Sequence, residues 1–494
     1  MKIAIIGGGV TGSNILRHIL DHKNFRLEDK IYIFEKRDLL GPGVPYEKDT
    51  PVKMLNVGPR LMSMDRENDD DLKEWLDKNV ENPINFEGLI SREDYGLYLR
   101  DYFKKYYESE NVEIIKEAVT DLDLVGEKFK LKTKEYLDIE FDTVFLALGH
   151  PDYNDFYDLK GIDNYIHNPY LMEEKLSGLD KDAKIGIIGA GASSVDVFRY
   201  LSLVVKPEKA FEFFVINSEI TKFPSIPLED KSKFKFSISY DWIRESINKN
   251  TGFIALEDGL KKVDGDLKAA GVDILESYEK YKDIDTYEGY QKLINEKPYD
   301  LQVLHYYFGL ISKYHAQIFG LLSKLDQEKY LNEYHKVFDI FFTLVPMKTS
   351  QWIIDSINEG KVIFNKGLKE IEHKDGKFVV AGEEVKEVDY LINTTGFNLD
   401  LMENAKENIL IKNLLNKKII SSQDSAKGIN VKWPDSSILS NKYGEIRNLI
   451  SIGFFQSGLH YMPNGALTMR EISKIAVDEY MDEVYLGLWY CFII

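Results

Sequence analysis

The chain begins with short apolar runs separated by one amphipathic stretch. Residues 2–6 form an apolar run that ends at a glycine cluster, and apolar residues within 15–20 then recur at the spacing of one helical face. A second apolar run covers residues 31–34. This order predicts a strand, a glycine turn, a helix and a second strand, which together make a βαβ unit.

The same order of elements returns about 180 residues later in the chain. The apolar run 185–188 leads into a second glycine cluster, and an apolar stripe over 195–205 predicts the helix that follows. The next apolar run, 211–216, predicts a further strand. The chain is therefore expected to hold two dinucleotide-type units.

Two other apolar runs end in glycine, one between the units and one after the second. The run 141–148 leads into Gly149, and the run 390–393 leads through two threonines into Gly396. Two similar strand ends after two βαβ units predict that one unit is nested inside the other.

The resulting prediction is an α/β fold with two Rossmann-like domains, the first of them discontinuous, and a helical insertion. The insertion is predicted where apolar residues shift to helical spacing and aromatic residues become dense. The expected segments are the first domain at 1–165 and 386–494, the second at 166–228 and 346–385, and the insertion at 229–345.

The first glycine cluster has the spacing of a dinucleotide-binding turn. Gly7 suits the tight turn, Gly9 lets the backbone approach a pyrophosphate, and Gly12 lets helix and strand pack closely. Glu35 follows Gly12 by 23 residues, at the end of the second strand, where a carboxylate can accept hydrogen bonds from a ribose. These residues together predict a dinucleotide site at the helix N-terminus.

The second cluster keeps two of the three glycines and has Ser194 in the third place. Counting 23 residues onward reaches Asn217, which stands where the first unit has Glu35. An uncharged residue does not repel the 2′-phosphate of NADPH, so NADPH is favoured, although NADH remains open. Ser218 and Lys222 are the nearest candidates to bind that phosphate. The residues expected at this site are Gly189, Gly191, Ser193, Ser194, Asn217 and Ser218.

Composition narrows the class of protein. The chain has 494 residues, 44% hydrophobic and 29% charged, which is ordinary for a folded soluble protein. Its net charge of −19 opposes binding to nucleic acid or to an anionic membrane. The single cysteine, Cys491, excludes an internal disulfide or a dithiol pair, and no residue spacing suggests a metal site.

The N-terminus carries no recognisable targeting signal, and no apolar run approaches the ~20 residues that span a bilayer. We therefore expect a cytoplasmic protein without a membrane span. The tail 484–494 is strongly apolar. It is expected to pack on the body of the protein, with a homodimer contact or a surface anchor as the alternatives.

Several stretches of the chain resemble a known group of proteins. They are the N-terminal IIGGGVTG, GPGVPY at 41–46, LNV at 55–57 with RLMS at 60–63, SR at 91–92 with YGLYL at 95–99, LALGHP, GAGASS, NTTGF and ISIGFFQSG. In these stretches the chain resembles the bacterial FAD/NAD(P)-binding protein family. These are two-dinucleotide-binding flavoproteins related to flavin-containing and N-hydroxylating monooxygenases.

The resemblance implies that the first domain binds FAD and that the second binds the nicotinamide cofactor. It further implies cofactor contacts from Asn56, Arg60, Ser63, Gly149, Gly396, Gly453, Gly458, Asn464 and Gly465. The fingerprint of the flavin-containing monooxygenases is present only in altered spacing, around Gly161, His167 and Tyr170.

Catalytic residues are harder to name from the sequence. His150 and His460 are candidates because each lies in a segment expected to face the flavin, although either histidine could instead bond to local backbone. The aromatic cluster at 306–314 is either insertion core or the wall of a substrate pocket.

The predicted function is an FAD-dependent NAD(P)H oxidoreductase, monooxygenase-like, that passes electrons to O₂ or to a small organic substrate. Two alternatives remain open at this point: an FAD-binding RNA-modifying enzyme, and a non-catalytic regulatory protein that binds flavin.

Overall fold

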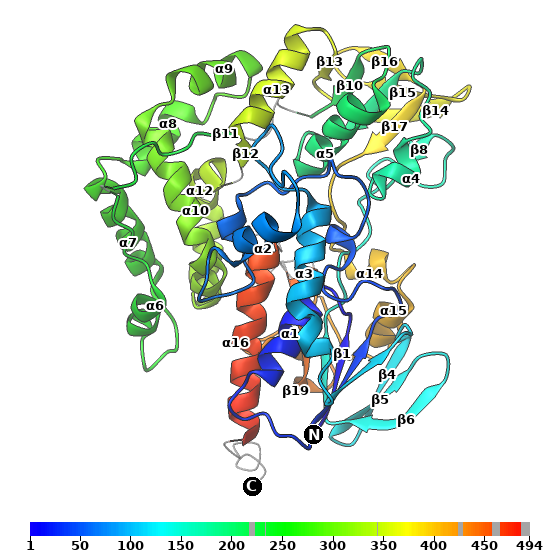
Figure 1. The fold of residues 1–494 in the computed structure, drawn as a ribbon, viewed down its shortest axis with the longest axis vertical. Helices are drawn as coiled ribbons and strands as arrows, with labels where there is room; N and C mark the ends of the chain where they lie inside the picture. The colour runs from blue at the N-terminus through cyan, green and yellow to red at the C-terminus, as the bar shows by residue number, and fades with distance from the viewer. Residues whose placement is uncertain (217–222, 233, 343, 423–427, 457–464, 486–494) are drawn as a thin grey trace.

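The computed structural model describes residues 1–216, 223–232, 234–342, 344–422, 428–456 and 465–485. Figure 1 shows two α/β bodies, one above the other, and a helical lobe beside them. The long helix α16 (Ala466–Tyr485) lies along α1 (Val10–Leu20) in the lower body.

The first sheet combines strands from both ends of the chain. Its order is β18-β19-β7-β1-β2-β3, and all neighbours are parallel except the pair β18 and β19. The strands are β1 (Lys2–Ile6), β2 (Lys30–Phe34), β3 (Val112–Ile115), β7 (Thr143–Leu146), β18 (Ser437–Ser440) and β19 (Gly444–Ser451). The first domain is thus discontinuous.

The second sheet is parallel throughout, in the order β13-β10-β9-β17-β8. Its strands are β8 (Tyr165–Ile166), β9 (Ile185–Ile188), β10 (Phe211–Phe214), β13 (Val362–Asn365) and β17 (Tyr390–Asn393). The helices α4 (Met172–Leu176), α5 (Ala192–Tyr200) and α13 (Met347–Asn358) accompany it, and α5 continues into a π-helical turn, η3 (Leu201–Val205).

One strand differs from its predicted assignment. The predicted boundary at residue 386 gives β17 to the first domain, but β17 pairs in register with β9 of the second sheet. Leu391 and Ile392 are fully buried there. One apolar run that leads into glycine follows each of the two units, so the sequence pattern alone does not show which sheet the second run joins.

A three-stranded antiparallel sheet precedes the returning strand of each domain. Strands β4 (Asp121–Val125), β5 (Lys128–Lys132) and β6 (Tyr136–Phe141) come before β7. Strands β14 (Glu370–Lys374), β15 (Lys377–Ala381) and β16 (Val385–Val388) come before β17.

The insertion is helical, as predicted, and it leaves and rejoins the second domain through one pair of strands. The strands β11 (Phe223–Ser225) and β12 (Leu344–Pro346) are parallel neighbours at its two ends. Between them lie α6 (Tyr240–Ser246), α7 (Leu256–Ala269), α8 (Ile274–Tyr281), α9 (Tyr287–Glu296), α10 (Tyr299–Gly320), α11 (Lys324–Lys329), the π-helical turn η4 (Tyr330–Tyr334) and α12 (His335–Phe342).

The aromatic residues of the insertion form its core. Tyr307, Phe308 and Phe341 are buried together with aliphatic side chains of α7 and α8. Side chains of Ser239, Asp273, Thr286 and Ser323 cap α6, α8, α9 and α11 by accepting hydrogen bonds from backbone N–H groups.

The remaining helices belong to the first domain. They are α2 (Asp71–Asn79), α3 (Arg92–Tyr107), α14 (Leu401–Asn404) and α15 (Ile409–Asn416), with short 3₁₀ turns η1 (Val44–Tyr46), η2 (Pro59–Met62) and η5 (Phe454–Gln456). No helix among the described residues is long and apolar enough to cross a membrane.

Candidate functional site: two glycine-opened helix ends facing one crevice

The first glycine turn brings two strands and a helix into close contact. Gly7 has φ +107°, and a Cβ there would lie 2.1 Å from the carbonyl oxygen of Ala147 at the end of β7. A Cβ at Gly12 would lie 1.9 Å from the carbonyl oxygen of Gly7. Both positions therefore require glycine, as the motif predicts.

Gly9 precedes the first turn of α1, and no side chain caps that turn. A Cβ on Gly9 would lie 3.2 Å from Cα of Gly43, which has φ +62° in the GPGVPY loop. The loop thus passes directly over the helix N-terminus. Backbone N–H groups and a partial positive charge are available there for an anion, which fits a pyrophosphate.

The acid predicted at the end of β2 is held beside this turn. One oxygen of Glu35 accepts a hydrogen bond from the backbone N–H of Gly8 at 3.1 Å, and the other accepts from the N–H of Arg37 at 3.0 Å. The hydroxyl of Tyr107 donates to the carbonyl of Gly8 at 3.0 Å. Both the carboxylate and the glycine loop are therefore fixed in place before any ligand binds.

The family-like stretches pack against one another around this turn. A Cβ on Gly96 in α3 would lie 2.0 Å from the carbonyl oxygen of Tyr46 in the GPGVPY loop. The hydroxyl of Tyr95 donates to the carbonyl of Met62 at 2.9 Å, in the RLMS stretch. These stretches hold the loop over the N-terminus of α1.

Arg60, Ser63 and Asn56, which the resemblance implied as cofactor contacts, differ in exposure and in their hydrogen-bond partners. Arg60 is exposed and makes a two-point ion pair with Asp70, with N···O distances of 2.7 and 2.6 Å. The buried hydroxyl of Ser63 donates to backbone carbonyls, including that of Asn68 at 2.8 Å. Asn56 is exposed. Their contacts with a cofactor stay predictions.

The second glycine turn has the same shape with a more open entrance. Gly189 has φ +98° and lies against Thr394, which follows β17. A Cβ added to Gly189 would lie 3.2 Å from Oγ1 of Thr394. Gly191 precedes α5 without a side-chain cap, and a Cβ there would meet no atom within 4 Å. The hydroxyl of Ser194 donates to the carbonyl of Gly191 at 2.6 Å. This open cradle fits a second pyrophosphate.

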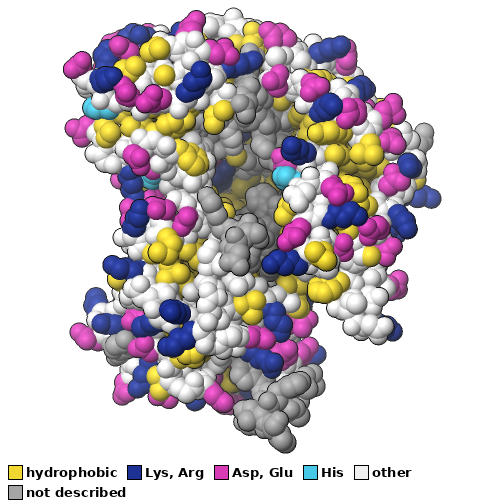
Figure 2. Space-filling view, turned by 180° about the vertical axis from the view of Figure 1, so that it is seen from behind, with side chains coloured by type: hydrophobic (Ala, Val, Ile, Leu, Met, Phe, Trp, Pro, Cys, Tyr) yellow, Lys and Arg dark blue, Asp and Glu magenta, His cyan; other side chains and the backbone are white. Residues whose placement is uncertain are grey.

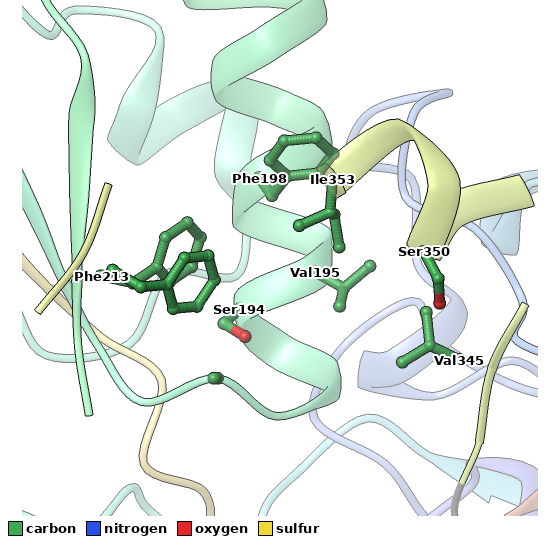
Figure 3. Close-up of a pocket in the computed structure, with 9 residues that line it drawn as sticks. Ser194, Val195, Phe198, Phe213, Val345, Ser350 and Ile353 are labelled. Carbon is green, nitrogen blue, oxygen red and sulfur yellow. The ribbon is translucent and has the colours of Figure 1, made fainter. Parts of the chain in front are cut away.

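A pocket lies behind the second turn, between α5 and α13 (Figure 3). The stacked rings of Phe213 and Phe364, with centroids 4.7 Å apart, form one wall. Ser194 and Ser350 contribute hydroxyl groups to a lining that is otherwise apolar. The pocket is a small, mostly apolar recess directly behind the glycine turn.

An aromatic cluster joins the ends of both sheets. The ring of His150, after β7, lies 4.6 Å from Phe397, after β17, and 4.7 Å from Phe454, after β19. Phe397 and Phe454 are 4.9 Å apart, and Tyr153 lies 4.7 Å from Phe397. The predicted strand ends therefore meet, and Gly149 and Gly396 both turn with positive φ.

Burial and the nearby Arg92 lower the pKa of His150 to about 4. Its imidazole is therefore neutral at pH 7. A neutral imidazole has one ring N–H and one acceptor nitrogen, so it can donate a hydrogen bond without bringing in a charge.

A buried network of charges, which the sequence analysis missed, connects the two domains. Arg92 of α3 pairs with Asp196 of α5 at 2.9 Å, and Asp196 pairs with Arg199 at 3.2 Å. Arg199 in turn pairs with Glu87 at 3.0 Å, and the side chains of Asp196, Arg199 and Glu87 are fully buried. Two positive and two negative charges balance, as a buried network requires.

Tyr170 links this network to the second glycine turn. Its hydroxyl lies 3.0 Å from Oδ2 of Asp196 and 3.2 Å from the hydroxyl of Ser193. Burial raises its pKa to about 12, so the phenol stays protonated. The only trace of the network in the sequence was Arg92 in the family-like pair SR.

Other predicted residues have definite positions or lie outside the described residues. Gly453 has φ +130°, with its added Cβ 4.0 Å from Oγ1 of Thr11, so the end of β19 lies beside the first glycine turn. Gly465 immediately precedes α16. Asn217, Ser218, Lys222, Gly458, His460, Asn464 and the tail 486–494 with Cys491 lie outside the described residues.

Among the described residues, no group of three or more His, Cys, Asp or Glu side chains could hold a metal ion. The site offers N–H donors at two helix N-termini, hydroxyl groups and the carboxylate of Glu35 as an acceptor, which suit phosphates and a ribose.

Comparison with known proteins agrees with this geometry. Residues 4–151 match a family model described as FAD-NAD(P)-binding, so the N-terminal part of the chain is an FAD/NAD(P)-binding domain. No curated protein matches the chain by sequence.

Solved structures of similar fold cover nearly the whole chain. The ornithine N-hydroxylase of Kutzneria sp. 744, with reduced FAD and NADP⁺, is 11% identical over 98% of this chain and 99% of its own, with a TM-score of 0.56. The L-lysine 6-monooxygenase of Pseudomonas syringae is 10% identical over 98% of this chain and 99% of its own, with a TM-score of 0.57.

The cyclohexanone monooxygenase of Rhodococcus sp. Phi1, bound to NADP⁺, is 15% identical over 99% of this chain and 84% of its own, with a TM-score of 0.51. These likenesses confirm the predicted α/β fold of two-dinucleotide-binding flavoproteins and the resemblance to monooxygenases at the level of fold.

Proposed function

We propose that the protein is an FAD-dependent NAD(P)H oxidoreductase of the monooxygenase type. One observation carries the proposal. Each of the two sheets has a helix, α1 or α5, whose N-terminus begins at a glycine without a side-chain cap, and the strand ends of the two sheets meet at the cluster of His150, Phe397 and Phe454. A reductant and an acceptor bound at these two turns would have their reactive ends in one shared crevice.

In this proposal FAD is held by Gly7, Gly9 and Gly12 around its pyrophosphate and by Glu35 at its ribose. The nicotinamide cofactor is held by Gly189, Gly191, Ser193 and Ser194. When bound, FAD supplies the transfer of two electrons from NAD(P)H to an acceptor. NADPH is the expected reductant because Asn217 brings no negative charge to the ribose.

The chain's own groups then orient these ligands and keep water away. The rings of Phe397 and Phe454 supply apolar surface at the centre of the crevice. His150, neutral at pH 7, offers a ring N–H as a hydrogen-bond donor there. Tyr170 and Asp196 fix the hydroxyl of Ser193 at the second turn.

The acceptor is proposed to be O₂, with or without a small organic substrate. Proteins of the same fold hydroxylate ornithine and lysine or act on cyclohexanone, which supports a small molecule as substrate. Figure 2 shows the rear face hollowed between the helical lobe and the two α/β bodies, with apolar side chains in the hollow. A substrate could enter through such a hollow.

We further propose a cytoplasmic protein that does not bind nucleic acid, because the net charge of −19 repels phosphate backbones. A homodimer formed through the apolar tail 484–494 remains part of the proposal.

The direct test is NADPH oxidation by the FAD-loaded protein without added substrate, with peroxide measured in parallel. Turnover above the rate of free FAD supports the oxidoreductase. Tight FAD binding with no NADPH or NADH turnover would instead support a regulatory flavin-binding protein.

A further inference from the structure

The helical insertion meets the first domain at a junction that brings cationic side chains together. Helix α10 of the insertion lies against α16, and Ala316 of α10 packs into the core of the first domain. Arg66, which lies between η2 and α2 of the first domain, and Lys313 of α10 are both partly buried at this junction. The two cations therefore come from different parts of the fold.

Tyr240 of α6 lies close to both cations. Cζ of Arg66 lies 5.4 Å from the centroid of the Tyr240 ring, and Nζ of Lys313 lies 5.8 Å from the same centroid. Both distances fall within the ~6 Å over which a ring attracts a cation. The ring of Tyr314 lies 4.9 Å from that of Tyr240 and helps to fix it. Two like charges are thus held around one ring.

One carboxylate serves two arginines at this junction. Oε1 of Glu471 accepts from Nε and Nη2 of Arg470 at 2.9 and 2.8 Å, and Oε2 lies 2.9 Å from Nη2 of Arg66. The hydroxyl of Tyr240 also donates to Oε2, at 2.6 Å. Arg470 and Glu471 are buried. The negative charge of Glu471 is therefore fully used before Lys313 is counted.

Lys313 adds a positive charge that the junction does not balance. Within the part of the chain that the structure describes, no Asp or Glu oxygen forms an ion pair with Lys313, and its ammonium is attracted instead to the ring of Tyr240. Asp478 acts on Arg66 from beyond ion-pair distance, and it is itself paired with Lys474. A partly buried charge without a counter-charge is unfavourable, so an anion that entered the junction would be stabilised.

The two cations offer complementary donors for such an anion. Arg66 makes its ion pair through Nη2 and keeps 20% of its side chain exposed. A guanidinium carries further N–H groups in a plane that matches a carboxylate or a phosphate, whereas the ammonium of a lysine adds a mobile point charge. Arg66 is therefore held by Glu471 in a fixed place, and the flexible stem of Lys313 can bring its charge to the same ligand.

We infer that Arg66 and Lys313 bind the carboxylate or phosphate group of a small molecule at the junction of the insertion and the first domain. The site uses no residue of the two glycine turns, and the inference does not depend on the proposed redox function.

The test measures the melting temperature of the full-length protein at pH 7 in acetate, in inorganic phosphate and in acetamide, the neutral isostere of acetate, at constant ionic strength. Lys313→Gln removes the charge and keeps a good helix former in α10. Lys336→Gln, at an exposed position of α12, is the matched control. An anion that binds the folded protein raises its melting temperature. Wild type and Lys336→Gln should respond alike, and the apparent Kd should be at least about tenfold higher in Lys313→Gln.

The same variant separates binding from a structural role. Without added anion, Lys313→Gln should melt at or above the temperature of the wild type, because it removes an unbalanced charge. A lower melting temperature would show that Lys313 stabilises the fold and would overturn the inference.

Three other results would also overturn it: no response of the wild type to either anion, equal responses of Lys313→Gln and Lys336→Gln, or an effect of acetamide equal to that of acetate. The anion with the lower Kd identifies the ligand group as a carboxylate or a phosphate. Because the readout is the melting temperature, it is separate from any failure of flavin reduction.

Discussion

At the scale of single residues, the glycines of the two turns have different tasks. Gly7 and Gly12 allow backbone contacts in which a Cβ would lie 1.9–2.1 Å from a carbonyl oxygen, so they serve packing within the protein. Gly191 stands at the open end of α5, where a Cβ would meet no atom within 4 Å, so it leaves room for a ligand. Gly9 stands at the N-terminus of α1, where it also allows the close approach of the loop at Gly43. A substitution at Gly191 should therefore affect binding more than folding.

Gly9→Val should abolish FAD binding. An added Cβ already lies 3.2 Å from Cα of Gly43, so the valine should displace the GPGVPY loop and fill the space that the pyrophosphate needs. Flavin content after purification and the melting temperature are the measurements. Gly178→Val is the matched control, because a Cβ at that exposed position meets no atom within 4 Å. Full flavin content in Gly9→Val would refute the assignment of the first turn.

Gly191→Val makes the corresponding test of the second turn. Its φ of −84° suits valine, and nothing within 4 Å opposes a Cβ, so the fold should persist. The side chain would project into the proposed pyrophosphate cradle. We expect FAD content to be unchanged and the Kd for NADPH to rise by at least about tenfold, as measured by calorimetry. An unchanged Kd would mean that the cofactor binds elsewhere.

At the scale of elements, α5 is fixed to the first domain by its charges as well as by its packing. Asp196 and Arg199 are one turn apart on α5, and they reach Arg92 of α3 and Glu87 before it. Tyr170 bonds to both Asp196 and Ser193, so the orientation of the second glycine turn depends on the same network. The network therefore sets how the second turn faces the first.

Asp196→Asn should lower the free energy of unfolding by about 3 kcal/mol, because it removes the counter-charge of Arg92 and leaves Arg199 paired with Glu87 alone. Denaturant unfolding is the measurement. Asp241→Asn is the control, since Asp241 pairs with Arg244 at the surface and should change stability little. Equal stability of the two variants would show that the network contributes nothing beyond packing.

The sequence predicts these elements unevenly, for physical reasons. The glycine turns and Glu35 are local features with fixed spacing, so they can be read directly from the chain. The ion pair of Arg199 and Glu87 joins residues 112 positions apart, and the hydrophobic periodicity of the chain does not predict such a pair. The strand β17 carries the same strand-end pattern as β7, so its sheet becomes clear only from its pairing with β9.

At the scale of the whole molecule, buried neutral histidines link stability to pH. Burial lowers the pKa of His305 to about 3, whereas an unfolded histidine titrates near about 6.5. Between these values the unfolded chain binds a proton that the folded chain does not. The stabilisation is therefore complete above about pH 6.5 and is lost as the pH falls toward 3. His150 and His315 act in the same direction.

His305→Asn should reduce this pH dependence. Nδ1 of His305 accepts a hydrogen bond from the backbone N–H of Ile226 at 2.9 Å, and the amide oxygen of asparagine can replace that acceptor without titrating. Melting temperatures at pH 7 and pH 5 are the measurement, and the difference between them should be smaller in the variant. The same difference in both proteins would exclude His305 as a source of the acid sensitivity.

The two domains together should bring ligands bound at the turns of α1 and α5 into contact at the crevice around His150. The most direct measurement is anaerobic mixing of the FAD-loaded protein with NADPH while the absorbance of oxidised flavin is followed. The account predicts that the absorbance disappears and that it returns on admission of air, and that Gly191→Val abolishes the first change. A protein that binds both FAD and NADPH but shows no flavin reduction would contradict it.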